Sequence, residues 1–254
     1  MSKSKLLFTL LITFGGIISV QQAMADAVQF SAVAVQRFPQ GEPKTAQMYV
    51  GHDVIRRDFQ DQNRQIIEII KMKSGKRYVI FPQQKSYQEY NEQPMNIGLG
   101  SSKPTNTNPC TGMPGEVCTK LGTEMVFGRK ADKWEVVREQ RGQKIKALIW
   151  IDVERGQALR QFFPDGTVIE LKQVASDTVN GRKTEKWESV LKKPNGQTNN
   201  TMQWYDPELG IIIREEIPGG YVRELTQIKV GPQPDKLFAI PNGYQKQAAT
   251  DQAR

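Results

Sequence analysis

The sequence has few of the residues that most often carry chemistry in proteins. It contains one histidine, His52, and two cysteines. A zinc site needs more ligands of these types than the chain offers, and no serine lies in a recognisable nucleophile motif. Glycine-rich phosphate loops, clustered metal ligands and dinucleotide fingerprints are also absent from the sequence. We therefore predict that the protein is not an enzyme and uses no cofactor or metal.

Long apolar runs are scarce as well. The exception is Leu6–Val20, which follows two lysines and precedes Ala23-Met24-Ala25. Its 15 residues are too few for a bilayer core, which needs roughly 20, and the small residues after it fit a signal-peptidase site. We predict a cleaved signal peptide at residues 1–25 and a periplasmic protein. No cysteine follows the cleavage site, so we expect no lipid anchor. The alternative is an uncleaved membrane anchor.

The chain is basic, with 35 lysines and arginines against 27 acidic residues and a formal net charge of +8. The basic residues are spread along the chain, whereas a nucleic-acid-binding protein usually gathers them on one face of a recognisable module. We therefore expect no nucleic-acid partner. Weak attraction to an anionic membrane surface is a more suitable role for this charge.

The two cysteines, Cys110 and Cys118, lie close together in the segment PCTGMPGEVC. In an oxidising compartment such a pair on a loop rich in proline and glycine favours a disulfide. The alternative is a redox-active pair, but the spacing differs from the short Cys-x-x-Cys motif of that chemistry. We predict a structural disulfide that staples a long loop at residues 91–119, which is rich in Pro, Gly, Ser, Thr and Asn.

One segment of the chain occurs twice. GRKADKWEVV at 128–137 returns as GRKTEKWESV at 181–190, with seven of ten positions identical and a conservative Asp132/Glu185 exchange. Further on, the spacing between matching residues grows by one just before Gly142 and Gly196. An inserted residue is tolerated in a turn, whereas within a strand it would turn every later side chain to the other face. These glycines therefore mark turns.

Each copy then divides into four short strands joined by turns rich in glycine, proline and aspartate, a pattern typical of antiparallel neighbours. We predict repeated four-strand meanders at 128–174 and 181–228. The strands of the first copy are expected at 130–138, 144–153, 157–163 and 167–174. A β-propeller has repeats of similar length and is the alternative, but only two copies are detectable.

The remaining part of the chain also shows strand patterns. The expected strands are Val28–Phe38, Gln47–Phe59, Gln65–Lys73, Arg77–Phe81 and Tyr87–Tyr90. The isoleucines between residues 65 and 71 also fit a helical stripe, but the run is short, β-branched and bounded by turns, which favours a strand. We predict one β domain over residues 26–244 and a flexible tail at 245–254.

Several of these segments resemble the outer-membrane lipoprotein-sorting superfamily, the LolA/LolB-like proteins. The resemblance rests on the dibasic strand VIRRDF at 54–59, the Gly-Arg-Lys-x-x-Lys-Trp and Trp-x-Asp-x-x-x-Gly motifs of both repeats, and LFAIPNGYQ at 237–245. It implies an incomplete, half-open β-barrel, a curved antiparallel sheet with an apolar concave side under a lid. The chain departs from the family in lacking an amphipathic helical period, and residues 91–119 stand in its place.

The four tryptophans recur in register in the two copies, as Trp134 with Trp187 and Trp150 with Trp204. They are either plain core or an aromatic wall for acyl chains. We expect all four rings on the concave side, with Trp134 and Trp187 in the core and Trp150 or Trp204 at a cavity. Two functions fit: a binding protein for lipid acyl chains or a lipoprotein, and an envelope protein-interaction or stress-sensing module without lipid.

Overall fold

The computed structural model describes residues 28–92, 107–111, 115–140 and 142–248. The expected signal peptide, most of the loop after residue 92 and the last six residues lie outside these ranges. Strands dominate the described part of the chain, and no helix in it is long and apolar enough to cross a membrane. Two short 3-10 helices are present, η1 (Pro82–Gln84) and η2 (Asp235–Phe238).

All strands of the described residues belong to a single sheet of 16 strands. In chain order they are β1 (Phe30–Arg37), β2 (Lys44–Gly51), β3 (Val54–Asp61), β4 (Arg64–Lys71), β5 (Lys76–Phe81), β6 (Ser86–Asn91), β7 (Glu116–Val126), β8 (Arg129–Gln140), β9 (Gln143–Asp152), β10 (Ala158–Phe162), β11 (Val168–Val179), β12 (Arg182–Lys192), β13 (Thr198–Asp206), β14 (Ile211–Ile217), β15 (Tyr221–Val230) and β16 (Gln245–Gln247).

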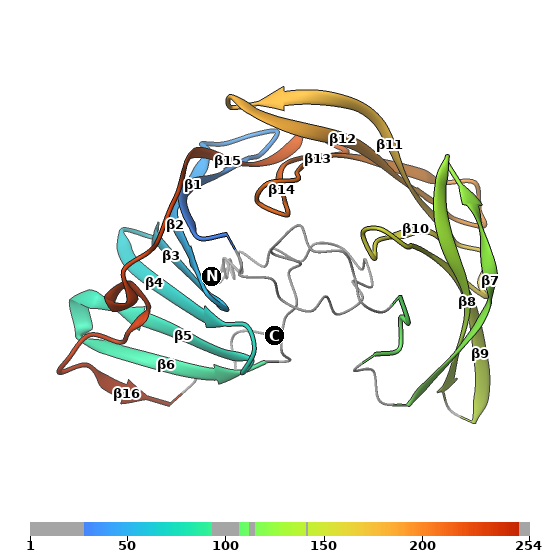
Figure 1. Ribbon diagram of the computed structural model, residues 1–254. Helices are drawn as coiled ribbons and strands as arrows, with labels where there is room; N and C mark the ends of the chain where they lie inside the picture. Colours follow the sequence, from blue (N-terminus) through green and yellow to red (C-terminus); the bar gives the residue numbers. More distant parts are fainter. Residues whose placement is uncertain (1–27, 93–106, 112–114, 141, 249–254) are drawn as a thin grey trace, which may run out of the picture.

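The strand order explains why the sheet is open. It runs β16-β6-β5-β4-β3-β2-β1-β15-β14-β13-β12-β11-β10-β9-β8-β7, so two antiparallel meanders meet where β1 pairs with β15. Strands β7 and β16 form the two edges and do not pair with each other. Because neighbouring strands twist relative to one another, the sheet curls into the open half-barrel seen in Figure 1. The predicted fold class, an incomplete β-barrel, is confirmed.

The two copies of the repeat form β8–β11 and β12–β15, four strands each, as predicted. The β7–β8 and β11–β12 hairpins, with which the two copies begin, have the same irregularities. A β-bulge at Leu121 in β7 matches one at Val174 in β11, and the hairpin tips at Phe127 and Asn180 both adopt a positive φ, 51° and 50°. Bulges bend a strand and increase its local twist, so the β7–β8 and β11–β12 hairpins bend the sheet at equivalent places.

The structure corrects three boundaries. The strand expected at 47–59 is two strands, because His52 and Asp53 form a turn in which Asp53 has φ of 56°. Cys118, expected in the loop, lies within β7. Gln245–Gln247, expected in a loose tail, pair in parallel with β6 as β16. A short polar segment carries little sequence signal for such pairing.

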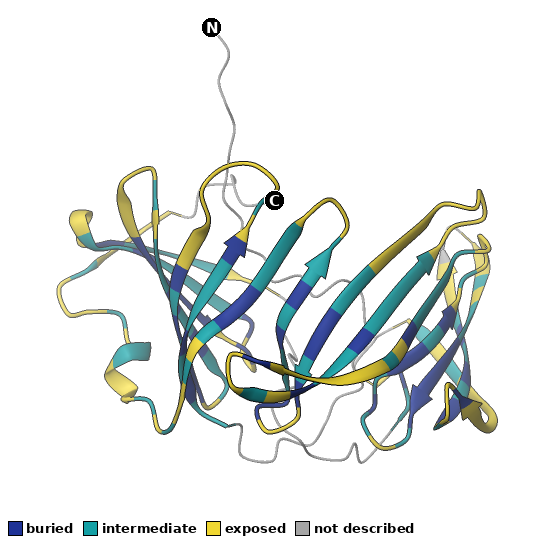
Figure 2. Cartoon of the chain, turned by 90° about the horizontal axis from the view of Figure 1, so that it is seen from above, coloured by how far each residue is buried: buried dark blue, intermediate teal, exposed yellow. Residues whose placement is uncertain are grey.

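Both faces of the first meander are covered in places. On the outer side, Ile67, Ile69 and Ile80 pack with Ile240 and Tyr244 from the segment after β15, which runs along the outside of the sheet (Figure 1). Along β1 to β3, buried positions recur among half-buried ones, whereas most of β7 and parts of β11 and β13 are exposed (Figure 2). Antiparallel sheets of this kind derive their stability from such alternating apolar faces.

Candidate ligand-binding surface

Within each copy of the repeat, an ion pair links the Gly-Arg-Lys motif to the Trp-x-Asp motif. In the second copy, Arg182 of Gly-Arg-Lys forms an ion pair with Asp206 of Trp-x-Asp, whose side chain is only 1% exposed. Asp206 Oδ1 also accepts the backbone N–H groups of Glu208 and Leu209, at 2.9 and 3.1 Å. The hydrogen bond to Asp206 raises the pKa of the Arg182 guanidinium above its ordinary value. One carboxylate thus closes the turn and ties it to the neighbouring hairpin.

The first copy repeats this arrangement. Arg129 pairs with the buried Asp152, whose Oδ1 accepts the N–H groups of Glu154 and Arg155 at 2.7 and 3.1 Å. The motif that occurs twice in the sequence is therefore an interlocked structural unit, in which a partly buried arginine and a buried aspartate have structural roles.

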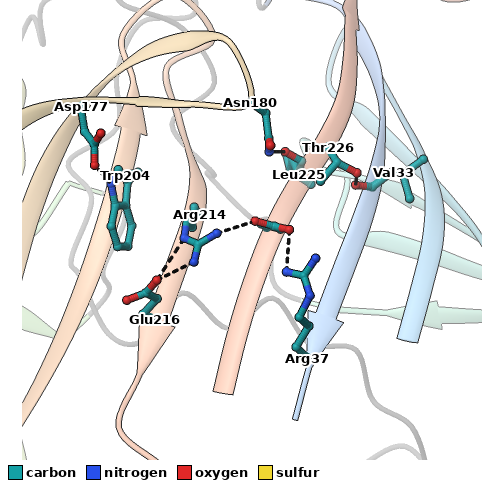
Figure 3. Close-up of polar contacts among 10 residues, drawn as sticks. Val33, Arg37, Asp177, Asn180, Trp204, Arg214, Glu216, Leu225 and Thr226 are labelled. Atoms are coloured by element: carbon teal, nitrogen blue, oxygen red, sulfur yellow. Dashed lines mark hydrogen bonds and ion pairs between the residues drawn. The ribbon is translucent and has the colours of Figure 1, made fainter. Parts of the chain in front are cut away.

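Trp204 is enclosed by charged side chains. Lys186 and Arg214 lie on the strands to either side of it, 4.8 and 5.3 Å from the ring centroid. Its indole N–H donates to Asp177 at 2.8 Å (Figure 3). This hydrogen bond is the main reason that the pKa of Asp177 lies below its ordinary value. Arg214 in turn pairs with Glu216 and with Glu224.

Trp150 has equivalent surroundings in the first copy. Lys133 lies 4.8 Å and Arg160 5.8 Å from its ring centroid, and its indole N–H donates to Glu124. Cations over the face of a tryptophan ring are attracted to it electrostatically. Trp150 and Trp204 are thus buried rings, each with cations beside it and a carboxylate at its indole N–H.

The expectation that all four rings face one side of the sheet is wrong. Trp150 pairs directly with Lys133, and Trp204 with Lys186. Successive residues of a strand point to opposite faces. Trp134 therefore points away from the face of Trp150, and Trp187 away from the face of Trp204.

Trp134 lies in a separate apolar patch on the inner side of the sheet. This patch comprises Trp134, Val136, Ile149, Ile151 and Ala158, all buried. Both cysteines pack against it. The predicted disulfide is confirmed, with Cys110 and Cys118 Cα atoms 5.8 Å apart, and residues 107–111 lie within the opening of the half-barrel (Figure 1). We call these five residues the Trp134 patch.

The indole N–H of Trp134 differs from the other three indole N–H groups in its hydrogen bonding. Trp187 donates to Glu185 at 3.2 Å, and Trp150 and Trp204 also donate to carboxylates. The Trp134 N–H is buried, and no residue in the described part of the chain accepts a hydrogen bond from it. Most buried polar groups in proteins have a partner, and among the described residues Ser86, Gln157 and Gln161 also carry a buried polar atom without one.

Asp132 explains the difference, although it looked like a conservative match for Glu185. Its Oδ1 accepts from Thr123 at 2.5 Å, and its Oδ2 lies 2.7 Å from both the Thr107 hydroxyl and Lys120 Nζ. Burial alone would raise the pKa of Asp132, but these three hydrogen bonds outweigh it and lower the pKa. Asp132 is thus engaged by other donors. It is also one methylene shorter than Glu185, which reaches the neighbouring indole.

A depression of about 740 Å³ lies elsewhere, along β1 to β4. Its lining includes Ala34, Ala46 and Phe59 together with Gln36 and Gln60, and none of the four tryptophans contributes to it. Its walls combine apolar and polar side chains. Phe59 ends the VIRRDF motif, but no pattern in the sequence marked the other lining residues as a site.

The single histidine lies apart from the tryptophans. His52 is in an exposed position, where its Nε2 lies 2.6 Å from Gln29 Nε2. Across the residues that the structure describes, no group of three or more His, Cys, Asp or Glu side chains is arranged to hold a metal ion.

No protein-family model matches the chain, and no curated protein matches it. Solved structures do match. A LolA superfamily protein from Nitrosomonas europaea is 12% identical over 86% of this chain and 92% of its own, with a TM-score of 0.34. An uncharacterised conserved protein from Thermus thermophilus is 11% identical over 88% and 91%, with a TM-score of 0.32.

A putative outer-membrane lipoprotein-sorting protein domain from Vibrio parahaemolyticus is 11% identical over 84% of this chain and 90% of its own, with a TM-score of 0.31. Two of these three structures carry the name of the superfamily that the sequence motifs resemble. At such identities the likeness concerns the fold and carries no information on a ligand.

Proposed function

We propose that the protein is a non-catalytic periplasmic binding protein that holds a lipid, or a lipid-modified partner, against the inner surface of its sheet. The observation that carries this proposal is the Trp134 patch, an apolar cluster on the inner side of a sheet whose two edges do not meet. The export signal predicted from the sequence supports the compartment.

An open half-barrel offers a concave surface, and such surfaces are common sites for apolar ligands. Each methylene moved from water into an apolar site contributes about 0.8 kcal/mol. A chain of about ten carbons can therefore overcome the entropy of association even if only part of it is buried. The apolar side chains of the patch provide this environment without any catalytic group.

The test identifies the molecules that remain bound to the protein when it is purified from the periplasm. The protein is purified from the native periplasm without detergent, extracted with organic solvent, and the extract is analysed by mass spectrometry. We expect a defined acyl lipid or acylated polypeptide in a fixed ratio to protein. A periplasmic protein of similar charge, purified in the same way, is the control. An extract identical to that control would refute the proposal.

A second candidate function is a protein-interaction or stress-sensing module without lipid, and strand β7 favours it. This edge strand has 11 residues, and its Val117, Leu121 and Met125 side chains are 64%, 52% and 66% exposed. Unpaired edges can add a strand from another chain. The protein would then be free of lipid and would retain one partner, and Val117→Lys with Met125→Lys would abolish the retention.

A further inference from the structure

The depression along β1 to β4 owes its shape to two small residues that lie side by side. Ala34 of β1 pairs directly with Ala46 of β2, and Ala46 pairs with Phe59 of β3, so the three side chains share one face of the sheet. Directly opposed Cβ atoms lie about 4.5–5.5 Å apart, and two alanines at that spacing leave the space above them open. The larger side chains of Phe59 and of the next pair, Gln36 and Lys44, bound this space.

Gln36 is a polar group that the fold leaves available at this site. The residue is only 9% exposed, and its side chain lines the depression. Within the described part of the chain its amide makes no hydrogen bond with another residue. A polar group withdrawn from water without a partner costs free energy, and a ligand in the depression would supply that partner.

The charge of the lining does not suit an anion. Lys44, Asp58 and Asp61 are its charged residues. Both oxygens of Asp58 already accept hydrogen bonds from Arg56, at 2.6 and 2.8 Å. A phosphate or a carboxylate would therefore meet one lysine and two carboxylates, so the depression offers no surplus of positive charge.

Amide groups dominate the polar part of the lining. Five of its 13 residues are glutamines, namely Gln36, Gln47, Gln60, Gln62 and Gln65. An amide side chain both donates and accepts hydrogen bonds, as a hydroxyl group does. Such a lining complements a neutral ligand with many hydroxyl groups. A sugar ring also has a face of C–H groups, which packs against apolar side chains such as Ala34 and Phe59.

The surrounding sheet favours a compact ligand over an extended peptide. Each of β1, β2, β3 and β4 has a neighbouring strand on both sides, so none of them can add a strand from another chain. Recognition at this place has to use side chains. The volume of about 740 Å³ lies within the range of roughly 300–1,000 Å³ that is usual for small-molecule sites.

We propose that the depression along β1 to β4 binds a neutral saccharide. Its hydroxyl groups exchange hydrogen bonds with the Gln36 amide, and its C–H face packs against Ala34, Ala46 and Phe59. The site contains none of the four tryptophans and goes beyond the proposed function. The sugar belongs to a free glycan or to the headgroup of a glycolipid, two sources with the same chemistry.

The first experiment applies the full-length mature protein to an array of immobilised neutral and acidic oligosaccharides. We expect retention on neutral members of the array. The neutral oligosaccharide that is retained most strongly, and its octyl glycoside, are then titrated by calorimetry. Equal affinities assign the site to glycans, and tighter binding of the octyl glycoside assigns it to glycolipid headgroups. Retention of no saccharide, or of acidic ones alone, would overturn the proposal.

Two variants place the saccharide in the depression. Ala34→Leu fills the space above the alanines and should abolish binding. Gln36→Leu removes the amide at similar size and should weaken binding about tenfold, the factor expected for one net hydrogen bond. The control is Gln173→Leu, because Gln173 is a half-buried glutamine of β11 outside the lining, and its affinity should be unchanged. Wild-type affinity in Ala34→Leu and Gln36→Leu would contradict the proposal.

A readout on the intact protein guards against variants that fold poorly. In a ¹⁵N–¹H spectrum, the side-chain amide peaks of Gln36 are those missing from Gln36→Leu, and those of Gln173 are assigned in the same way. The titrated oligosaccharide should shift the Gln36 peaks and leave the Gln173 peaks in place. If Gln36→Leu fails to fold, Asp61→Ala at the end of β3 takes its place, with the backbone amide peak of residue 61 as the readout. Peaks that do not move at either residue would show that the saccharide does not bind here, while the proposed lipid function would stand.

Discussion

Replacement of Asp206 by alanine is the sharpest test of the interlocked repeat unit. The Asp206 side chain is 1% exposed, and its partner Arg182 is 18% exposed. Removing one member of a buried ion pair typically costs about 3–5 kcal/mol, and Arg182 would keep only its exposed partner Glu208. Asp206 also accepts two backbone N–H groups, so the turn after β13 loses its closure in the same substitution. We expect Asp206→Ala to lower the free energy of unfolding by about 3–5 kcal/mol.

Two further substitutions separate the contribution of the Asp206 charge from those of its backbone hydrogen bonds and of the neighbouring Glu208. Asp206→Asn keeps an oxygen for the backbone N–H groups and loses the charge, so it should cost roughly 1.5–3 kcal/mol, the range for hydrogen bonds to charged groups. Glu208 pairs with the same arginine at 2.9 Å, but its side chain is 70% exposed. Exposed ion pairs contribute at most about 1 kcal/mol, so Glu208→Ala should be nearly neutral.

The assay is urea unfolding followed by circular dichroism, with the slope of the transition compared among variants to check that the unfolding reaction is the same. Asp152→Ala should cost a similar amount to Asp206→Ala, because Asp152 makes the same contacts in the first copy. A cost below about 1 kcal/mol for Asp206→Ala, or an equal cost for Glu208→Ala, would refute the reasoning.

Single contacts give three more predictions. Trp204→Phe should cost more than Trp134→Phe, because both lose the same buried ring volume but only Trp204 also loses a hydrogen bond to a carboxylate; urea unfolding checks both. Cys110→Ser should cost about 2–3 kcal/mol in the same assay, and two free thiols in the denatured, unreduced wild type would contradict the disulfide. Hydrogen bonds from Lys246 and Lys76 lower the pKa of Glu89 from 4.5 to about 2. The anchoring of β16 should therefore be complete above the ordinary pKa of 4.5 and be lost as the pH falls toward 2. The hydrogen-exchange protection factor of the Gln247 amide measures this loss. In Glu89→Gln, this protection factor should no longer depend on pH.

The repeat was readable in the sequence because two independent signals coincide in it. Glycine marks the turns, and the one-residue insertion must fall in a turn, so Gly142 and Gly196 locate the hairpins, where both adopt positive φ. The register of β8 with β9 follows from this turn. Counting outward from it pairs Trp150 with Lys133, so the opposite orientation of Trp134 was also contained in the sequence.

Other features depend on partners that are distant in sequence. Nothing local in Phe30–Arg37 specifies that it pairs with Tyr221–Val230, because a period-two pattern shows which side is apolar but not which strand is the neighbour. The turn at Asp53 was missed because an aspartate, not a glycine, adopts the left-handed conformation there. The unpaired donor of Trp134 depends on Thr107, which reaches Asp132 from outside the repeat.

The proposed function requires an acyl chain to lie on the inner surface of the sheet, at the Trp134 patch. Brominated stearic acid quenches tryptophan fluorescence on contact, and unbrominated stearic acid controls for any change in conformation. We expect quenching in the wild type and in Trp150→Phe, since that ring points to the opposite side of the β8–β9 hairpin, and clearly reduced quenching in Trp134→Phe. Equal quenching in both variants, or none in the wild type, would contradict this placement of the ligand.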